Sequence, residues 1–223
     1  SSLTSLGINA ETLWEAAARQ GLKSAVLHYP GSMPSRLKQG YIIDGNAGPA
    51  YNACPFELAA AEAYTSDRTV ESGSLKEIIL RPAQGWKGLP AGGPPPLSAT
   101  LPVSAKNPDG DTTWQALALG DGGGYNRVVI CRGKDLATAM GECRLNQWSE
   151  WATVTIGGKE GAVRFKLTTL SPDGKSIKLY RSQIMPSSGF SDPDEIGAEL
   201  IRELGPYQEY VSQMFNVLGI IDY

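Results

Sequence analysis

The clearest pattern in this chain is the alternation of apolar and polar residues between residues 148 and 185, which predicts three consecutive antiparallel strands. In the middle strand, Val163, Phe165 and Leu167 face one side, and the residues between them are polar or charged. A period of two with one apolar face is typical of a half-buried strand. Such a sheet needs a second layer on its apolar face, and we expect helices to provide it.

Two glycine-containing connections join these strands. Residues 157–161 predict a loose hairpin, and Ser-Pro-Asp-Gly at 171–174 predicts a tight turn with its glycine in the left-handed position. In the third strand the apolar positions change parity between Leu179 and Tyr180. Either a bulge lies there or both faces of the strand are buried.

The N-terminal segment predicts a helix, a strand and a turn in succession. Asn9 is a suitable cap for a helix over residues 10–20, which ends at Gly21 in a left-handed conformation. The buried stripe of this helix consists of Leu13, Trp14, Ala17 and Ala18. The nearly continuous apolar run at 24–29 is typical of a strand buried on both faces of a parallel sheet, and Pro-Gly-Ser at 30–32 ends it. Together they form one αβ unit of a doubly wound fold.

The middle of the chain is predicted to contain both helices and strands. The pattern predicts helices over 55–64 and 136–144, strands over 41–43, 75–80 and 97–105, and a hairpin of 112–119 with 125–131. Glycine and proline at 84–96 exclude regular structure there, which indicates a surface loop held by Trp86.

Two helices are expected near the C-terminal end. Asp192 caps the first, Pro193 occupies its first position and Gly205 ends it. Its apolar stripe consists of Ile196, Leu200, Ile201 and Leu204. A second helix covers about 207–218, and the aliphatic residues directly after it suggest a cut within a longer protein.

Composition narrows the class of protein. The 20 basic and 23 acidic residues give a net charge of −3, with no cluster of either sign. We therefore expect no nucleic-acid surface, which would show a basic stripe. No apolar run approaches the ~20 residues that span a bilayer, so no membrane segment is expected. There is no signal-peptide pattern, and the compartment stays open on the residues alone.

The cysteines do not predict a metal site. Cys54, Cys131 and Cys143 are odd in number and show no CxxC spacing, so zinc held by paired thiolates is not expected. Three buried thiols are the preferred interpretation. One disulfide with one free thiol is the alternative.

Two loops could bind an ion, and each has a structural alternative. The glycine-rich tip at 120–124 could hold phosphate, but it lacks the Lys-Ser/Thr end of a P-loop, which favours a hairpin tip. Residues 107–111 carry oxygen side chains at alternate positions, as calcium loops do. Thr112 and Ala118 stand where an EF-hand needs glycine and glutamate, and this favours a solvated turn.

Two sets of side chains could contact a ligand. His28 is the only histidine and follows the predicted parallel strand, at the edge where open α/β sheets bind ligands. A packed, hydrogen-bonded core histidine is nevertheless the preferred interpretation. Trp86, Trp148 and Trp151 could form a platform for carbohydrate, although roles as core residues or loop anchors are preferred. The serines at 187–188 do not stand in a GxSxG elbow.

Two blocks of residues carry a resemblance to one known family. The first block is Glu11 to Ala17, Gly21, and the strand at 24–29 with its Pro30-Gly31-Ser32 turn. The second block comprises Trp148-Ser149-Glu150-Trp151, residues 164–167, Leu179-Tyr180 and residues 189–193. The first block resembles the type I phosphodiesterase/nucleotide pyrophosphatase branch of the alkaline phosphatase superfamily, and the second is similar to an insertion in the catalytic core of its large bacterial members.

The strand pattern and the C-terminal helices predict a fold of class α+β, to which the resemblance adds the origin of the N-terminal unit. An antiparallel sheet built on 148–185 is packed with helices, and residues 1–32 form an αβ unit of an alkaline-phosphatase-like α/β core. Residues 33–223 then form an inserted accessory domain, with one compact unit over 1–223 as the alternative. The resemblance also favours a periplasmic or secreted location.

The resemblance implies hydrolysis of phosphate esters by a parent enzyme, meaning the longer protein of which this chain would be part. Such enzymes use a threonine or serine nucleophile and a pair of divalent metals, usually zinc, held by Asp and His. One histidine cannot supply these ligands, so no catalytic residue, metal ligand or cofactor is assigned to this chain. The residues predicted to contact substrate are His28, Tyr29, Gly31 and Ser32.

The predicted function is therefore that of an accessory domain, inactive alone, that shapes the substrate cleft of the parent enzyme. Its expected partners are the remainder of the parent catalytic domain and, through it, a phosphate-ester substrate. The alternative is a self-contained module that binds carbohydrate or a cell-surface polymer.

Overall fold

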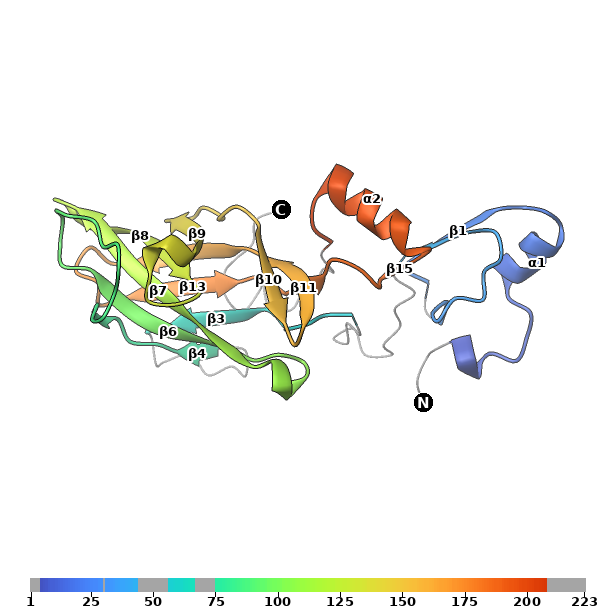
Figure 1. Ribbon diagram of the computed structural model, residues 1–223, viewed down its shortest axis with the longest axis horizontal. Helices are drawn as coiled ribbons and strands as arrows, with labels where there is room; N and C mark the ends of the chain where they lie inside the picture. The colour runs from blue at the N-terminus through green and yellow to red at the C-terminus, as the bar shows by residue number, and fades with distance from the viewer. Residues whose placement is uncertain (1–4, 30, 44–55, 67–74, 208–223) are drawn as a thin grey trace. The chain divides into compact units, whose positions relative to one another are not determined.

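The computed structural model describes residues 5–29, 31–43, 56–66 and 75–207 of the chain and divides it into two compact units (Figure 1). Unit 1 comprises Ser1–Glu57 with Met185–Val211, and unit 2 comprises Leu58–Ile184 with Ser212–Tyr223. Within the described residues both α-helices lie in unit 1, and most strands lie in unit 2. The fold is therefore α+β, as predicted, with antiparallel strands predominating.

Five strands of unit 2 form one antiparallel sheet in chain order: β5 (Arg81–Pro82), β6 (Leu97–Val103), β7 (Thr112–Asp121), β8 (Gly124–Cys131) and β9 (Ala139–Arg144). The strand predicted at 97–105 and the hairpin predicted around 120–124 are confirmed. The helix predicted over 136–144 is wrong, because only η3 (Leu136–Thr138) is helical. The rest is β9, since pairing with β8 places Cys143 in the core.

Four further strands of unit 2 form a second sheet: β12 (Phe165–Leu170), β13 (Ile177–Arg181), β3 (Glu62–Thr65) and β4 (Leu75–Glu77). Strand β13 is antiparallel to β12 and β3, and β4 is parallel to β3. The helix predicted over 55–64 is wrong within the described residues. Pairing with β13 makes β3 extended, so tertiary contacts override the local preference.

The prediction of three consecutive antiparallel strands between residues 148 and 185 is wrong in its pairing. Its middle strand is interrupted at Arg164 and splits into two strands. Strand β11 (Lys159–Val163) forms a hairpin with β10 (Ala152–Ile156), whereas β12 pairs with β13. The predicted inward side chains Val163, Phe165 and Leu167 are nevertheless fully buried.

Both faces of β13 are covered, which resolves the change of parity noted in the sequence. Leu179 and Tyr180 are both buried although they face opposite sides. The bulge lies in the partner strand β12 instead, where the register shifts between Leu167 and Thr169.

The core of unit 2 lies between its two large sheets. The ring of Trp114 on β7 contacts that of Phe165 on β12 edge to face, with centroids 5.8 Å apart. The Tyr64 hydroxyl on β3 donates to the carbonyl oxygen of Pro102 on β6, at 2.9 Å. The second layer expected to be helical is therefore another sheet, because the alternating strands of both sheets supply apolar faces that cover one another.

Unit 1 begins with η1 (Ser5–Gly7) and α1 (Leu13–Arg19). The cap of α1 is Thr12 and not Asn9. The Thr12 hydroxyl accepts from the Glu15 N–H at 3.3 Å, and the Thr12 N–H donates to Glu15 Oε2 at 2.8 Å, which is a capping box. Gly21 is left-handed, as predicted. Of the predicted stripe, Trp14 is buried, but Leu13 is 84% exposed.

Strands β1 (Ser24–Leu27) and β2 (Gly40–Ile43) of unit 1 are parallel, and β15 (Ser191–Asp192) is antiparallel to β2. A parallel sheet was predicted for residues 24–29, but its partner strand was not. Burial of β1 on both faces is wrong, because only Val26 is buried and Leu27 is 62% exposed.

Helix α2 (Asp194–Leu204) follows the short strand β14 (Met185–Pro186) and β15, and it begins one residue later than predicted, with Pro193 as its cap. Gly205 ends it. The Gly197 N–H donates to Ser191 Oγ at 2.9 Å, and a Cβ at this glycine would lie 2.5 Å from that oxygen. The predicted second helix, from residue 208 onward, lies outside the described residues.

Candidate functional site

The predicted site begins with His28, which directly follows β1 of unit 1. Its backbone is left-handed (φ 48°), and its N–H donates to the carbonyl oxygen of Ile43 at 2.9 Å. The imidazole stacks on the ring of Tyr207, with centroids 6.4 Å apart, and Tyr207 stacks on Phe190 at 4.6 Å. His28 is thus exposed at the carboxyl end of a parallel strand with one ring face on an aromatic pair.

The other predicted residues follow immediately. Tyr29 is 58% exposed and meets Trp14 of α1 edge to face, with centroids 5.5 Å apart. Gly31 is left-handed and buried (φ 78°). Ser32 is fully buried and its N–H donates to the Tyr29 carbonyl oxygen at 3.2 Å. Pro30 lies outside the described residues.

The turn therefore brings His28, Tyr29, Gly31 and Ser32 to one end of β1. The described residues supply no hydrogen-bond partner to Ser32 Oγ, so this buried hydroxyl keeps both its donor and its acceptor capacity. No base contacts it within the described part of the chain and the side chain is fully buried, so the arrangement does not supply an activated nucleophile.

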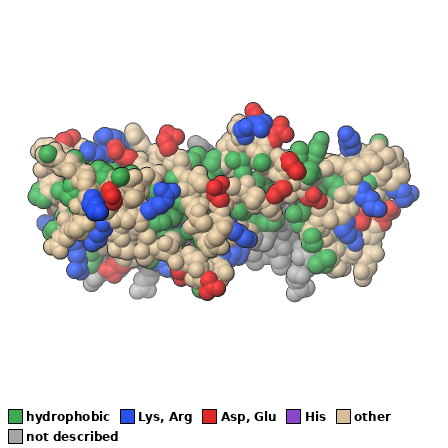
Figure 2. Space-filling view, viewed as in Figure 1, with side chains coloured by type: hydrophobic (Ala, Val, Ile, Leu, Met, Phe, Trp, Pro, Cys, Tyr) green, Lys and Arg blue, Asp and Glu red, His purple; other side chains and the backbone are tan. Residues whose placement is uncertain are grey.

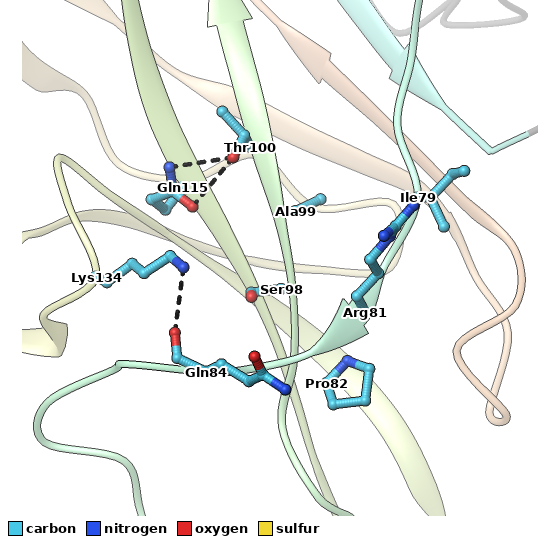
Figure 3. Close-up of a pocket in the computed structure, with 9 residues that line it drawn as sticks. All are labelled: Ile79, Arg81, Pro82, Gln84, Ser98, Ala99, Thr100, Gln115 and Lys134. Atoms are coloured by element: carbon cyan, nitrogen blue, oxygen red, sulfur yellow. Dashed lines mark hydrogen bonds between the residues drawn. The ribbon is translucent and has the colours of Figure 1, made fainter.

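A second candidate site, which the sequence did not predict, is a cleft of about 480 Å³ in unit 2 (Figure 3). Its floor is the outer face of β6 and β7, where Ser98, Thr100 and Gln115 point away from the core. One wall is the edge strand β5 with Arg81. The other wall consists of Gln84 and Lys134.

Three of the six polar side chains that line this cleft are hydrogen-bonded within the described residues. Thr100 and Gln115 hydrogen-bond to each other at 3.3 Å, and Lys134 Nζ donates to the Gln84 carbonyl oxygen at 3.2 Å. The described residues offer the Arg81 guanidinium no hydrogen bond or ion pair. The signal in the sequence that points to this cleft is the alternation of polar Ser98 and Thr100 with the buried Ala99 and Leu101 along β6. It identifies an outward polar row but not the loop that forms the wall.

That loop is the glycine- and proline-rich segment at 84–96, and Trp86 holds it as predicted. Trp86 and Leu89 pack against Leu117 and Val129 on the outer face of the five-stranded sheet. The loop therefore covers part of this face and leaves the cleft beside it.

The three tryptophans do not form a common platform. Trp148 and Trp151 both contact one cation, the Arg164 guanidinium, whose Cζ lies 4.2 Å and 4.6 Å from their respective ring centroids. Trp148 also meets Tyr180 edge to face at 5.6 Å. Trp86 belongs to a separate apolar cluster, and both Trp86 and Trp151 are half-buried.

The two loops considered for ion binding are turns. Residues 107–111 contain η2 (Pro108–Gly110), in which Asn107 accepts from the Asp109 N–H at 3.3 Å, and Asp111 accepts from the Ala105 N–H at 2.7 Å. The tip at 120–124 joins β7 to β8, and Asp121 accepts from Gly123 N–H at 3.1 Å. These carboxylate and amide oxygens accept hydrogen bonds from backbone N–H groups in or beside the turns.

The two described cysteines of unit 2 are buried thiols in the core of the sheets. Cys131 and Cys143 are buried and not disulfide-bonded, as the preferred interpretation held, and Cys54 lies outside the described residues. Burial raises the pKa of Cys131 to about 11 and that of Cys143 to about 12. Thiols with such pKa values stay protonated and unreactive near neutral pH.

Charge on the visible face of the molecule is mixed. Basic and acidic side chains are interspersed in Figure 2. Within the described residues, no helix is long and apolar enough to cross a membrane.

Comparisons of the chain with protein-family models, with curated proteins and with solved structures found no match. The resemblance to the phosphodiesterase branch therefore stays a prediction from the residues quoted above.

Proposed function

We propose that this chain is an accessory region of a phosphodiesterase-like metallohydrolase, with unit 2 inserted into a segment of the parent core and shaping its substrate cleft. Unit 1 would contribute to the core, and its turn after β1 would contact the phosphate-ester substrate. The nucleophile and the metal ligands would come from the rest of the parent enzyme.

The observation that carries the proposal is the way in which the chain enters and leaves unit 2. The Leu58 N–H donates to the Ile184 carbonyl oxygen at 2.8 Å, and the Ile184 N–H donates to the Ala59 carbonyl oxygen at 2.9 Å. The two ends of the segment are thus hydrogen-bonded neighbours, and the residues on either side of it belong to unit 1. A domain whose ends are adjacent can be inserted into another domain with little disturbance.

Exposed apolar side chains in unit 1 support the proposal. Leu27 on β1 is 62% exposed, Tyr41 on β2 is 42% exposed, and Leu13 on α1 is 84% exposed. Parallel strands are usually covered on both faces. A larger α/β core would provide that cover.

The described residues do not fit a two-zinc centre. No group of three or more His, Cys, Asp or Glu side chains is placed to hold a metal ion within the described ranges. We therefore assign no metal and no bond-breaking step to them. Substrate contact is assigned to His28 through its exposed ring, whereas Ser32 is fully buried, so its contact with substrate requires the turn to open.

The first test is an activity assay of the chain alone. The purified chain is incubated with bis(p-nitrophenyl) phosphate with and without added zinc, and p-nitrophenolate release is measured. The expected result is no zinc-dependent turnover above the buffer rate, and no stoichiometric zinc after dialysis. Zinc-dependent turnover would overturn the assignment of the catalytic groups to other polypeptide.

The second test concerns the parent enzyme. The coding sequence on either side of the chain is expected to encode the Asp and His ligands and the threonine or serine nucleophile. In that enzyme, replacing residues 60–183 by a short glycine linker should preserve zinc binding, because Leu58 and Ile184 already lie together. Flanking sequence without such ligands would contradict the proposal.

A further inference from the structure

We propose that the cleft between β5, β6 and the loop at 84–96 binds a sugar phosphate. This inference goes beyond the proposed function and does not depend on it, because every residue it uses lies in unit 2. A cleft of about 480 Å³ is within the ~300–1,000 Å³ range of small-ligand sites.

The charge of the cleft selects an anion. Arg81 and Lys134 line opposite sides of the floor (Figure 3), and none of the residues lining the cleft is acidic. The Arg81 guanidinium has five N–H donors in a planar fork and no partner among the described residues. Lys134 uses one donor on the Gln84 carbonyl oxygen and has two more. An arginine without a carboxylate partner is well suited to a phosphate group.

The floor selects hydroxyl groups. Ser98, Thr100 and the Gln115 amide each combine a donor with an acceptor, as a sugar hydroxyl does. The Gln84 side chain adds a further amide at the rim. The cleft therefore pairs cationic walls with a neutral floor that can both donate and accept, which matches a ligand carrying one charged ester and several hydroxyls.

A second cleft in unit 2 provides an internal comparison. It has a similar size and is lined by Lys175, Lys178 and polar residues including Thr65 and Ser176. There one of the two lysines is paired, since Lys175 Nζ lies 3.4 Å from Asp173 Oδ2, and none of the residues lining that cleft is an arginine with a planar fork of donors. The cleft beside Arg81 is the better anion site for this reason.

The experiment is a titration of the whole chain, labelled with 15N, with glucose 6-phosphate, followed by amide shifts and by calorimetry. Glucose and inorganic phosphate are titrated in parallel. We expect shifts at Ser98, Thr100 and Gln115 with a Kd of about 1 mM or tighter. We expect Arg81→Met and Lys134→Met each to weaken binding about tenfold, which corresponds to one lost charged hydrogen bond of ~1.4 kcal/mol. Lys178→Met, in the comparison cleft, should leave binding unchanged.

Three results would overturn the inference. The first is the absence of shifts on the cleft floor at about ten times that Kd. The second is equal binding by the wild type and the Arg81→Met and Lys134→Met variants. The third is equal affinity for inorganic phosphate and glucose 6-phosphate, which would reduce the cleft to a simple anion site. Circular dichroism of each variant shows whether a loss of binding reflects a loss of fold.

Discussion

Arg181 donates from Nη2 to Oε2 of Glu62 over 2.9 Å, although the two residues are 119 positions apart in the chain. They are direct cross-strand partners on β13 and β3, and Arg181 is fully buried. The same guanidinium donates to the carbonyl oxygens of Ala60 at 2.6 Å and Ser182 at 2.9 Å. A buried charge is thereby paired and hydrogen-bonded, as its desolvation requires.

The first prediction tests this pair. Glu62→Gln removes the negative charge and leaves Arg181 charged and buried, so we expect the free energy of unfolding to fall by about 3–5 kcal/mol. Urea unfolding followed by circular dichroism measures the change. The matched control is Glu142→Gln, whose carboxylate is half-exposed and lies 3.4 Å from Arg144. It should cost less than about 1 kcal/mol. Equal losses in the two variants would contradict a structural role for the buried pair.

The second prediction concerns two left-handed glycines. A Cβ at Gly174 (φ 73°) would lie 2.5 Å from Leu97 Cδ1 and 2.9 Å from Tyr125 Cε2, whereas a Cβ at Gly158 (φ 78°) would meet nothing within 4 Å. Gly158→Ala should therefore cost only the backbone strain, about 1–2 kcal/mol. Gly174→Ala should cost about 1–3 kcal/mol more, because the packed side chains must move. Thermal unfolding compares the two, and an equal loss would show that the clash is relieved.

The third prediction concerns Arg164 between Trp148 and Trp151. Arg164→Met removes the cation–π contacts while keeping an apolar stem, and we expect a loss of about 1–2 kcal/mol in the free energy of unfolding. Tryptophan emission should also shift, because both rings lose the guanidinium, although Trp148 retains Lys166, whose Nζ lies 5.6 Å from its ring centroid. The control is Arg144→Met, since Arg144 is exposed on β9 and stacks on neither ring. An unchanged emission spectrum in Arg164→Met would contradict the stacked arrangement.

The fourth prediction is a loss of stability at alkaline pH. Burial raises the pKa of Cys143 from 9.0 to about 12 and that of Tyr64 from 10.0 to about 12. Between the usual and the raised pKa the unfolded chain releases protons that the folded chain retains, so the free energy of unfolding falls as pH rises. Each group contributes up to ~1.4 kcal/mol per pH unit in that window.

The decline should be visible in urea midpoints measured from pH 8 to pH 11. The double variant Cys131→Ala with Cys143→Ala should flatten the part between pH 9 and pH 10. Among the described residues with a raised pKa, the two thiols contribute there, since the windows of Tyr64 and Tyr180 start at the ordinary pKa of 10.0. The slope, and not the absolute stability, is compared, because the substitutions also leave small cavities. The same slope in wild type and variant would rule out the thiols as its source.

The sequence by itself determined the local features of this protein. The alternation at Val163, Phe165 and Leu167 correctly predicted three fully buried side chains, and Gly174 and Gly21 were correctly placed in left-handed turns. The hairpin of β7 and β8 was also predicted, as was a parallel sheet for residues 24–29, although not its partner β2. Each depends on residues close together in the chain, whose periodicity and turn chemistry are visible without the rest of the fold.

Only the tertiary structure decided which strands pair and where the candidate sites lie. Glu62 is in a strand because Arg181 lies opposite it, and the predicted middle strand divides at Arg164 because its two halves pair with different partners. The cleft beside Arg81 exists because the loop held by Trp86 covers part of one sheet face. Such arrangements depend on contacts between distant residues, and the pattern along a single chain contains no information about which apolar faces meet.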